Sequence, residues 1–401
     1  MRIAIVADVY PPMRSSGAVQ LRDLSRELVR QAHEVTMLVA APELEAPYAL
    51  ERNDGVSIVR LRTLPTRDMP YLRRLANELS MPFAMRRNFV GSPCFAQEFD
   101  AIVWYSPTIF HGPFVRWLKR RNKAPSYLII RDVFPQWAAD TGLIGRGPAF
   151  RILDSVAHYQ YRSADIIGVQ TPGNLAFFER FRERNPDVRF EVLKNWLAPA
   201  ATGTCSIDLS ATRLAGRKVF VYAGNMGVAQ QMDKLLNLAI ALRSNPEIGF
   251  LFVGRGSEAE RVRVSIESNC PENTLFFDEI DSDEIPALYK QCHVGMISLD
   301  SRHRTHNIPG KFLTYMQAGL PVLASINAGN DLEAIVAEAE VGRVSVDPNG
   351  GDLEILATSM LGQDLADPGI AQRCRTLFDR NFSAAQAATQ ITDTLSRLSR
   401  G

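Results

Sequence analysis

Three short turns rich in small residues could each hold a phosphate group. Ser15-Ser16-Gly17 follows the first apolar stretch of the chain, and Gly224-Asn225-Met226-Gly227 follows a later one. The third turn, HNIPGK from His306 to Lys311, precedes a helical pattern that ends near Gln317. In each turn, free backbone N–H groups at the positive end of a helix would face an anion. One turn of this kind between a strand and a helix is weak evidence, because α/β proteins contain many of them, but three such turns suggest phosphate binding.

Three side chains near predicted strand or helix ends are candidates for chemistry. Lys311 puts a full charge at a helix N-terminus, which costs stability unless an anion binds; the alternative is a solvated surface lysine. Asp132 follows the strand YLII and could bind acceptor hydroxyls, or could cap a helix or pair with Arg131. His111 could lie beside it, although a structural role is favoured for a lone histidine.

The elements that would position these residues form a repeated α/β pattern. Short apolar strands alternate with helical stretches, which predicts a parallel sheet, and the pattern restarts near Lys218. We therefore expect two Rossmann-like domains, at residues 1–196 and 217–378. Residues 197–216, rich in Ala, Thr, Ser and Gly, would link them, and residues 379–401 would form a helix that crosses back to the first domain.

Length and composition fit this organisation. The chain has 401 residues, 46% of them hydrophobic and 22% charged, as expected for two soluble domains. Its five cysteines show no CxxC pair, which favours reduced thiols in the cytoplasm. We expect no signal peptide and no membrane-spanning stretch.

Several common motifs are absent. Neither G-x-G-x-x-G after Asp8 nor G-x-x-x-x-G-K-[ST] occurs, which argues against a dehydrogenase and a P-loop NTPase. Asp281-Ser282-Asp283 resembles a D-x-D metal motif, but it lies in an acidic turn before a predicted helix, where caps are expected. We therefore expect no metal site and no cofactor.

Charge is distributed unevenly along the chain. Residues 60–123 contain 12 Arg or Lys and four acidic residues, a surplus of +8, whereas the whole chain is only +1. Bulky apolar residues are interleaved with these cations, which suits an anionic membrane surface; the alternative is an ordinary solvated helix face. Nucleic acid is a weaker option because no nucleic-acid-binding module accompanies the charge.

The order of motifs resembles a known family, the retaining nucleotide-sugar glycosyltransferases of family 4 with the GT-B fold. The closest resemblance is to the branch that builds O-antigen and capsule, including transferases of N-acetyl-fucosamine-type sugars. It covers nearly the whole chain and is carried by YPPMRSSG (10–17), IRDVFPQWAADTG (130–142), ADIIGVQTPG (164–173), LKNW (193–196), YAGNMGVAQQMDKLL (222–236), FVGRGSE (252–258) and IPGKFLTYMQAGLPVLAS (308–325).

The resemblance implies two domains facing across a cleft, with the acceptor bound by the first and the donor by the second. The donor would be a nucleotide sugar, and the acceptor a polyprenyl-diphosphate-linked sugar at the inner face of the cell membrane. Catalytic roles would fall to Asp132, Lys311 and His111. The implied donor-site residues are Ser16, Gly17, Asn225, Gly227, Arg255, Phe277, Ile280, Lys311 and Thr314.

Two departures from the family pattern affect donor binding. The usual carboxylate pair is replaced by His306 and Thr314, and two usual cations by Asn225 and Gln230 or Gln231. Two other functions therefore stay open: a UDP-sugar 2-epimerase of the same fold, and a non-catalytic paralogue that binds a sugar nucleotide.

Overall fold

The computed structural model describes residues 1–13, 15–66, 69–106, 108–140, 142–200, 202–301 and 308–399. The chain divides into two compact units. The first comprises Met1–Ala198 with Ala384–Gly401, and the second comprises Pro199–Ser383. His306, which stands where the family has a carboxylate, lies outside the described residues.

The first unit is built on one sheet with the strand order β3-β4-β2-β1-β5-β6-β7-β8. All neighbouring pairs are parallel except β3 and β4, which are antiparallel. The strands are β1 (Arg2–Ala7), β2 (Glu34–Ala41), β3 (Tyr48–Asn53), β4 (Val56–Arg62), β5 (Ala101–Tyr105), β6 (Ser126–Ile129), β7 (Ile166–Val169) and β8 (Arg189–Val192).

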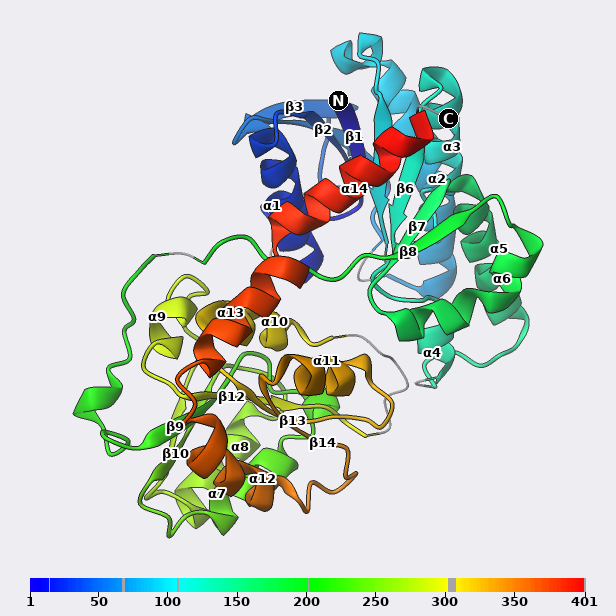
Figure 1. Cartoon of the computed structure of the whole chain (residues 1–401). Helices are drawn as coiled ribbons and strands as arrows, with labels where there is room; N and C mark the ends of the chain where they lie inside the picture. Colours follow the sequence, from blue (N-terminus) through cyan, green and yellow to red (C-terminus); the bar gives the residue numbers. More distant parts are fainter. Residues whose placement is uncertain are drawn as a thin grey trace. The chain divides into compact units, whose positions relative to one another are not determined.

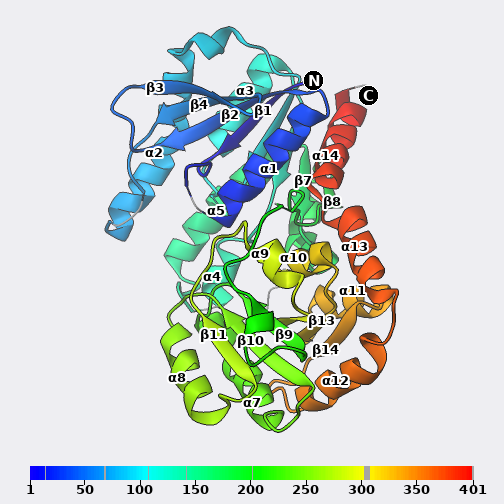
Figure 2. The ribbon, with the colours of Figure 1, turned by 90° about the vertical axis from the view of Figure 1, so that its left-hand side faces the viewer.

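Helices cover both faces of this sheet because its central strands are apolar on both sides. On β1, Ile3 and Ile5 pack into one core cluster, whereas Ala4 and Val6 pack into another. Figure 2 shows α1 lying along β1. The helices are α1 (Ser16–Arg30), α2 (Tyr71–Val90), α3 (Gly112–Asn122), α4 (Gln136–Asp140), α5 (Pro148–Ser163), α6 (Glu179–Arg184) and α14 (Ala384–Ser399).

The last helix, α14, packs on the first unit next to α1 (Figure 1). Ala387, Ala388, Ile391 and Leu395 bury its apolar face in the same cluster as α1. Gln390 adds polar contacts, since its Nε2 donates to Glu191 Oε1 (3.0 Å) and to the Val192 carbonyl (2.9 Å). The end of the chain is therefore an integral part of the first unit.

The second unit has a parallel sheet in the order β11-β10-β9-β12-β13-β14. The order reverses at β9, which pairs with both β10 and β12, and ligands of such sheets bind beyond the strand ends at this point. The strands are β9 (Lys218–Ala223), β10 (Ile248–Val253), β11 (Thr274–Phe277), β12 (Val294–Ser298), β13 (Val322–Ser325) and β14 (Gly342–Ser345).

Seven α-helices within the described residues surround this second sheet (Figure 1). One face of the sheet packs against α7, α8 and α12 in a single apolar cluster. The helices are α7 (Asp233–Ala241), α8 (Ala259–Asn269), α9 (Ile285–Tyr289), α10 (Gly310–Ala318), α11 (Asp331–Ala339), α12 (Leu353–Ser359) and α13 (Ile370–Asn381).

The segment expected as a linker is anchored to the second unit from Pro199 onward. The Leu209 N–H donates to Gln291 Oε1 (2.8 Å), and Gln291 Nε2 donates to the Ile207 carbonyl (2.8 Å). Leu209 and Leu214 are buried. A few apolar side chains in an otherwise polar stretch are enough to hold it against the domain.

Two edge strands, β3 and β14, do not stand out in the sequence. The β3 sequence YALERN places most of its residues in solvent, and the short β14 sequence GRVS is mostly half-buried. Edge strands need apolar residues on fewer positions than central strands do, so their hydrophobic pattern is weak.

Candidate functional site

Lys311 lies where the second sheet reverses its order. It is the second residue of α10, a helix that follows Pro309 and ends at Gly319 in the left-handed conformation. Phe312, Leu313, Tyr315 and Met316 of this helix are buried. The apolar face fixes the helix, so Lys311 extends from a rigid N-terminal turn, as the sequence predicted.

The Lys311 ammonium group packs on protein rather than reaching into solvent. Its Nζ lies 4.5 Å from the centre of the Tyr222 ring at the end of β9, which is cation–π geometry. It also lies 3.3 Å from where a Cβ on Gly224 would stand. Within the described residues, no carboxylate forms an ion pair with Lys311.

Burial lowers the pKa of Lys311 to about 8. Desolvation disfavours the charged form of a lysine, and here no neighbouring carboxylate opposes it. A buried cation at the positive end of a helix is electrostatically unfavourable by itself and is stabilised by an anion. The surroundings of Lys311 are therefore those of an anion-binding group.

A cluster of tyrosines supports this site. The Tyr315 hydroxyl donates toward the carbonyls of Val221 (3.0 Å) and Met296 (3.2 Å), and its ring lies 5.0 Å from that of Tyr289. The Thr314 hydroxyl donates to the Lys311 carbonyl (2.9 Å) and is hydrogen-bonded to Tyr289. Thr314 is thus engaged with its own helix, and a ribose contact would have to compete with these bonds.

Two glycine turns interlock beside Lys311. Gly224 (φ 126°) and Gly254 (φ 149°) adopt conformations that favour glycine, and a Cβ on Gly254 would lie 2.0 Å from the Gly224 carbonyl oxygen. The Met226 N–H donates to the Arg255 carbonyl (2.7 Å). Glycine is required because the two backbones touch, and the contact fixes the turn that carries Asn225 and Gly227.

The amide side chains of this turn bond to one another. Asn225 Nδ2 and the Gly227 N–H both donate to Gln230 Oε1, at 3.1 and 2.9 Å. A 3₁₀ turn, Val228–Gln230, follows, and α7 begins only at Asp233. A short 3₁₀ segment therefore separates this turn from α7.

Phe277 ends β11, and Arg255 and Ile280 lie in the loops just after β10 and β11. Arg255 is 78% exposed, and its Nε pairs with Glu279 Oε2 at 3.0 Å, so part of its charge is already neutralised. The Phe277 carbonyl accepts from the Gly254 N–H (3.1 Å). The backbone of Ile280 has no hydrogen-bond partner among the described residues, so it is available to a ligand.

In the first unit, Ser16 and Gly17 open helix α1. Ser15 caps the helix, since its Oγ accepts from the Ala18 N–H (3.2 Å). The N–H groups of Ser16 and Gly17 have no acceptor in the described part of the chain. A Cβ on Gly17 would lie 3.1 Å from the hydroxyl oxygen of buried Tyr105.

Asp132 lies near Tyr105, at the same edge of the first sheet. Asp132 and Asp8 raise the pKa of Tyr105 while Arg131 lowers it, and burial is the main reason that this pKa reaches about 12. The Arg131 guanidinium bonds to the Asn195 side chain. The structure therefore places Asp132 among charged groups beyond the strand ends, and its side chain is exposed.

His111 occupies a different environment from the other candidates. Its ring is fully buried, neither ring nitrogen has a hydrogen-bond partner among the described residues, and burial lowers its pKa to about 3. It precedes α3 without capping it. This position favours the structural role of a neutral packed imidazole over contact with an acceptor.

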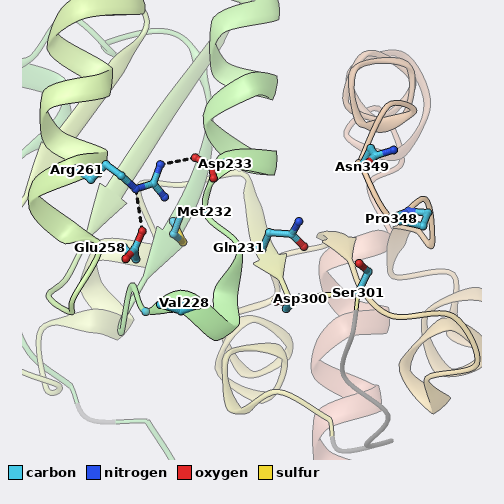
Figure 3. Close-up of a pocket in the computed structure, with 11 residues that line it drawn as sticks. Val228, Gln231, Met232, Asp233, Glu258, Arg261, Asp300, Ser301, Pro348 and Asn349 are labelled. Carbon is cyan, nitrogen blue, oxygen red and sulfur yellow. Dashed lines mark hydrogen bonds and ion pairs between the residues drawn. The ribbon is translucent and has the colours of Figure 1, made fainter. Parts of the chain in front are cut away.

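A cavity of about 320 Å³ adjoins the β9–α7 segment (Figure 3). Its lining includes Gly227 and Gln231 from the donor-site turn, together with Asp300 and Asn349, which were not candidates from the sequence. Asp300 follows a strand end, as Asp132 does, so that signal was present. The tyrosines around Lys311 could also have been found, since Tyr315 stands four residues after Lys311 on the same helix.

The described residues hold neither a metal-binding cluster nor a membrane-spanning helix. No cluster of three or more His, Cys, Asp or Glu side chains suited to a metal ion occurs in that part of the chain. Within the same residues, no helix combines the length and the apolar character that crossing a bilayer requires.

The two halves of the chain match two glycosyltransferase family models. Residues 17–196 match the glycosyl transferase 4-like domain, and residues 217–361 match glycosyl transferases group 1. The probable glycosyltransferase WbjE of Pseudomonas aeruginosa is 25% identical over 222 residues, 54% of each chain. The putative colanic acid biosynthesis glycosyl transferase WcaI of Escherichia coli (strain K12) is 24% identical over 315 residues, 73% of this chain and 76% of WcaI.

Solved structures share the fold over nearly the whole chain. Sucrose-phosphate synthase from Thermosynechococcus elongatus has a TM-score of 0.70 at 15% identity, covering 99% of this chain and 98% of its own. Anabaena HepE in complex with UDP-glucose has a TM-score of 0.66 at 15% identity, covering 99% of this chain and 100% of HepE.

Two parallel α/β units in tandem, with these structural likenesses, define a GT-B fold. The chain belongs to the glycosyltransferases, with a glycosyl transferase 4-like domain followed by a group 1 domain. The matched stretch spans about half the length of WbjE.

Proposed function

We propose that this protein is a retaining glycosyltransferase that moves a sugar from a UDP-sugar to a lipid-linked saccharide during surface polysaccharide synthesis. The observation that carries the proposal is Lys311, a half-buried cation at the N-terminus of α10 with no carboxylate partner among the described residues. Such a group is arranged to bind a diphosphate and to stabilise the charge that develops when the diphosphate leaves.

The donor assignment is supported by the backbone around Lys311. The close-packed turns at Gly224 and Gly254 let a phosphate approach the chain, and the free backbone of Ile280 offers groups to a base. HepE, which shares the fold, has been solved with UDP and with UDP-glucose. Within the UDP-sugars, the O-antigen resemblance favours a UDP-N-acetyl deoxyhexosamine.

In the proposed reaction, side chains of this protein stabilise the leaving group. The bond between the sugar C1 and the phosphate oxygen breaks, and its electron pair stays with the UDP oxygen. The acceptor hydroxyl oxygen bonds to C1 on the same face, and its proton goes to the departing phosphate oxygen. Lys311 stabilises the developing negative charge, and Asp132 binds an acceptor hydroxyl. We assign no step to a metal ion, so EDTA should leave the rate unchanged.

The acceptor assignment rests on the relatives and on one surface of the first unit. WcaI is named for colanic acid biosynthesis, and WaaG, which has the same fold, for lipopolysaccharide biosynthesis. Helix α2 exposes Tyr71 (88%), Leu72 (84%) and Phe83 (63%) among exposed arginines. Aromatic and basic side chains together bind anionic lipid surfaces, so we propose peripheral attachment to the inner face of the cell membrane.

A screen of UDP-sugars tests the function directly. Each UDP-sugar is incubated with the protein and a polyprenyl-diphosphate-linked sugar, and the product is identified by mass. Donor-dependent extension of the lipid-linked acceptor by one sugar supports the proposal, with the anomeric configuration retained. Absence of extension with every donor, in a protein that binds UDP, would instead support the non-catalytic alternative.

The same assay separates an epimerase from a transferase. A UDP-sugar 2-epimerase converts its substrate without an acceptor, so reactions lacking the lipid-linked sugar would show a new UDP-sugar. The family matches favour the transferase, because both halves of the chain fit glycosyltransferase models.

A further inference from the structure

The cavity beyond the β9–α7 segment has a distinct lining. Four pieces of the second unit enclose about 320 Å³: this segment, the start of α8, the end of β12 and the loop after β14 (Figure 3). Lys311 and Arg255 do not line it, whereas Gly227, a predicted donor-site residue, does. Ligand cavities run from roughly 300 to 1,000 Å³, so this one suits a small ligand rather than a nucleotide.

The charged groups of the lining disfavour a phosphate. Three carboxylates, Asp233, Glu258 and Asp300, face one guanidinium, Arg261. Arg261 is engaged by two of them, since its Nε donates to Glu258 Oε2 (2.8 Å) and its other nitrogen pairs with Asp233. The cation therefore has little charge left for an anion, and a ligand phosphate would meet a surplus of negative charge.

Asp300 is held at the inner end of the cavity. It is only 7% exposed, and its N–H donates to the Ala229 carbonyl (3.0 Å). The buried ammonium of Lys234 donates to the Leu299 carbonyl (3.3 Å), and it interacts electrostatically with Asp300. A carboxylate so fixed is a rigid hydrogen-bond acceptor.

Gln231 provides a second acceptor with no partner. Its side-chain Oε1 is buried and makes no hydrogen bond to any residue that the structure describes. The residue sits in the left-handed conformation (φ 42°), and its carbonyl accepts from the Ser298 hydroxyl (3.2 Å). A buried acceptor without a donor costs free energy that a ligand hydroxyl would recover. In Figure 3 the Gln231 side chain points into the region bounded by Asp300 and Ser301.

We propose that this cavity binds one uncharged monosaccharide unit, whose hydroxyls donate hydrogen bonds to Gln231 Oε1 and Asp300. Among the described residues the lining is rich in acceptors and poor in free cations, which favours a ligand with several donors and no negative charge, and a sugar ring has this chemistry. Val228 and Met232 add apolar surface for the ring carbons. The inference rests on the proposed function for its ligand class. It adds a saccharide subsite that borders the donor-site turn at Gly227 and does not include Lys311.

Ligand-observed NMR tests the subsite. Saturation transfer is measured on D-glucose, D-galactose and N-acetyl-D-glucosamine, each with the full-length protein, and UDP binding is measured by calorimetry. At least one monosaccharide should bind, and saturating UDP should not displace it. No saturation transfer to any of the three sugars, or displacement by UDP, would overturn the inference.

The variant Gln231→Gly removes the amide at a backbone conformation that glycine prefers, so folding is retained. Monosaccharide affinity should fall roughly three- to tenfold, as for the loss of one neutral hydrogen bond. Glu340→Gly is the matched control, because Glu340 is also left-handed (φ 52°) in the same unit but outside the cavity. Equal sugar binding by wild type and Gln231→Gly would refute the subsite.

Lys311→Ala distinguishes this inference from the proposed function. In that variant UDP binding should be lost while the monosaccharide still binds. If the wild-type protein binds the monosaccharide but not UDP, the assignment of a UDP-sugar donor is wrong, whereas the monosaccharide subsite is supported. Loss of sugar binding in a folded Lys311→Ala protein would show that the monosaccharide and UDP bind at one site, and would overturn the separate subsite.

Discussion

The ammonium nitrogen of Lys311 lies 4.5 Å from the centre of the Tyr222 ring. The ring covers one side of the cation, and within the described residues no carboxylate pairs with it. The Tyr222 hydroxyl donates to the Asn225 carbonyl (2.6 Å), so the same residue holds the neighbouring turn in place. Tyr222 thus links the position of the cation to that of the backbone proposed to bind the donor.

Replacing Lys311 with alanine should abolish most transfer without unfolding the protein. Removing one group that stabilises a transition-state oxyanion costs roughly 10²–10³ in rate. Steady-state transfer with the best UDP-sugar measures the loss, and circular dichroism checks the fold. Lys290→Ala is the control, since Lys290 is exposed in the same unit, and its rate should match wild type. Near-normal turnover of Lys311→Ala would show that Lys311 does not stabilise the leaving group.

Affinity for UDP should fall as the pH rises through about 8. Burial lowers the pKa of Lys311 to about 8, so the free protein loses this cation above that pH. The nearby tyrosines do not titrate in this range, because burial raises the pKa of Tyr222 and Tyr289 above its usual value of 10. Calorimetry from pH 7 to 9.5 measures the effect. Lys311→Arg keeps its charge throughout this range, so its UDP affinity should not change with pH. If the UDP affinity of this variant falls with pH as steeply as that of wild type, a group other than Lys311 titrates.

Lys311 should also make the free protein less stable below pH 8 than above it. Its pKa is about 8 in the folded chain against the ordinary 10.5, so between these values the unfolded chain binds more protons. The unfolding free energy contributed by this group therefore rises with pH across that window. Urea unfolding at pH 7.5 and 9.5 gives the change for wild type and for Lys311→Met. The rise should be larger in wild type, and an identical pH dependence in both would contradict the lowered pKa.

The sequence predicted the alternating strands and helices of the second domain better than the details of its turns. Lys311 was identifiable because a charged residue at a helix N-terminus conflicts with the helix dipole, and such local conflicts mark functional sites. The three-residue turn before Asp233 was missed because Val228–Gln230 has no helical period. The buried state of His111 and the unpaired Gln231 Oε1 depend on tertiary packing, which no local pattern encodes.

Adding a methyl group at Gly224 should weaken UDP binding by moving Lys311. An alanine Cβ there would lie 3.1 Å from Lys311 Cε, and the backbone φ of 126° also disfavours alanine. Calorimetry with UDP should show an affinity loss that exceeds the effect expected from lower stability alone. Gly216→Ala is the control, because Gly216 has φ 77° with open space around it. UDP affinity that falls equally in both variants would assign the effect to backbone strain.

Neutralising the arginines of α2 should release the protein from anionic membranes. Arg73, Arg74, Arg86 and Arg87 are exposed on the helix that also exposes Leu72 and Phe83, and near the surface each cation contributes about 1 kcal/mol of attraction to anionic lipid. Co-sedimentation with phosphatidylglycerol-containing vesicles should therefore be lost in the variant with all four changed to glutamine, whereas zwitterionic vesicles should bind neither protein.

The matched control changes four other exposed arginines of the same unit, Arg151, Arg162, Arg180 and Arg184, to glutamine. It alters net charge by the same amount and should retain vesicle binding, because those side chains lie on α5 and α6 rather than α2. Equal loss in both variants would indicate that total charge governs binding. Replacing Leu72 and Phe83 with serine should also reduce binding if α2 inserts its apolar side chains, and unchanged binding would restrict α2 to a purely electrostatic contact.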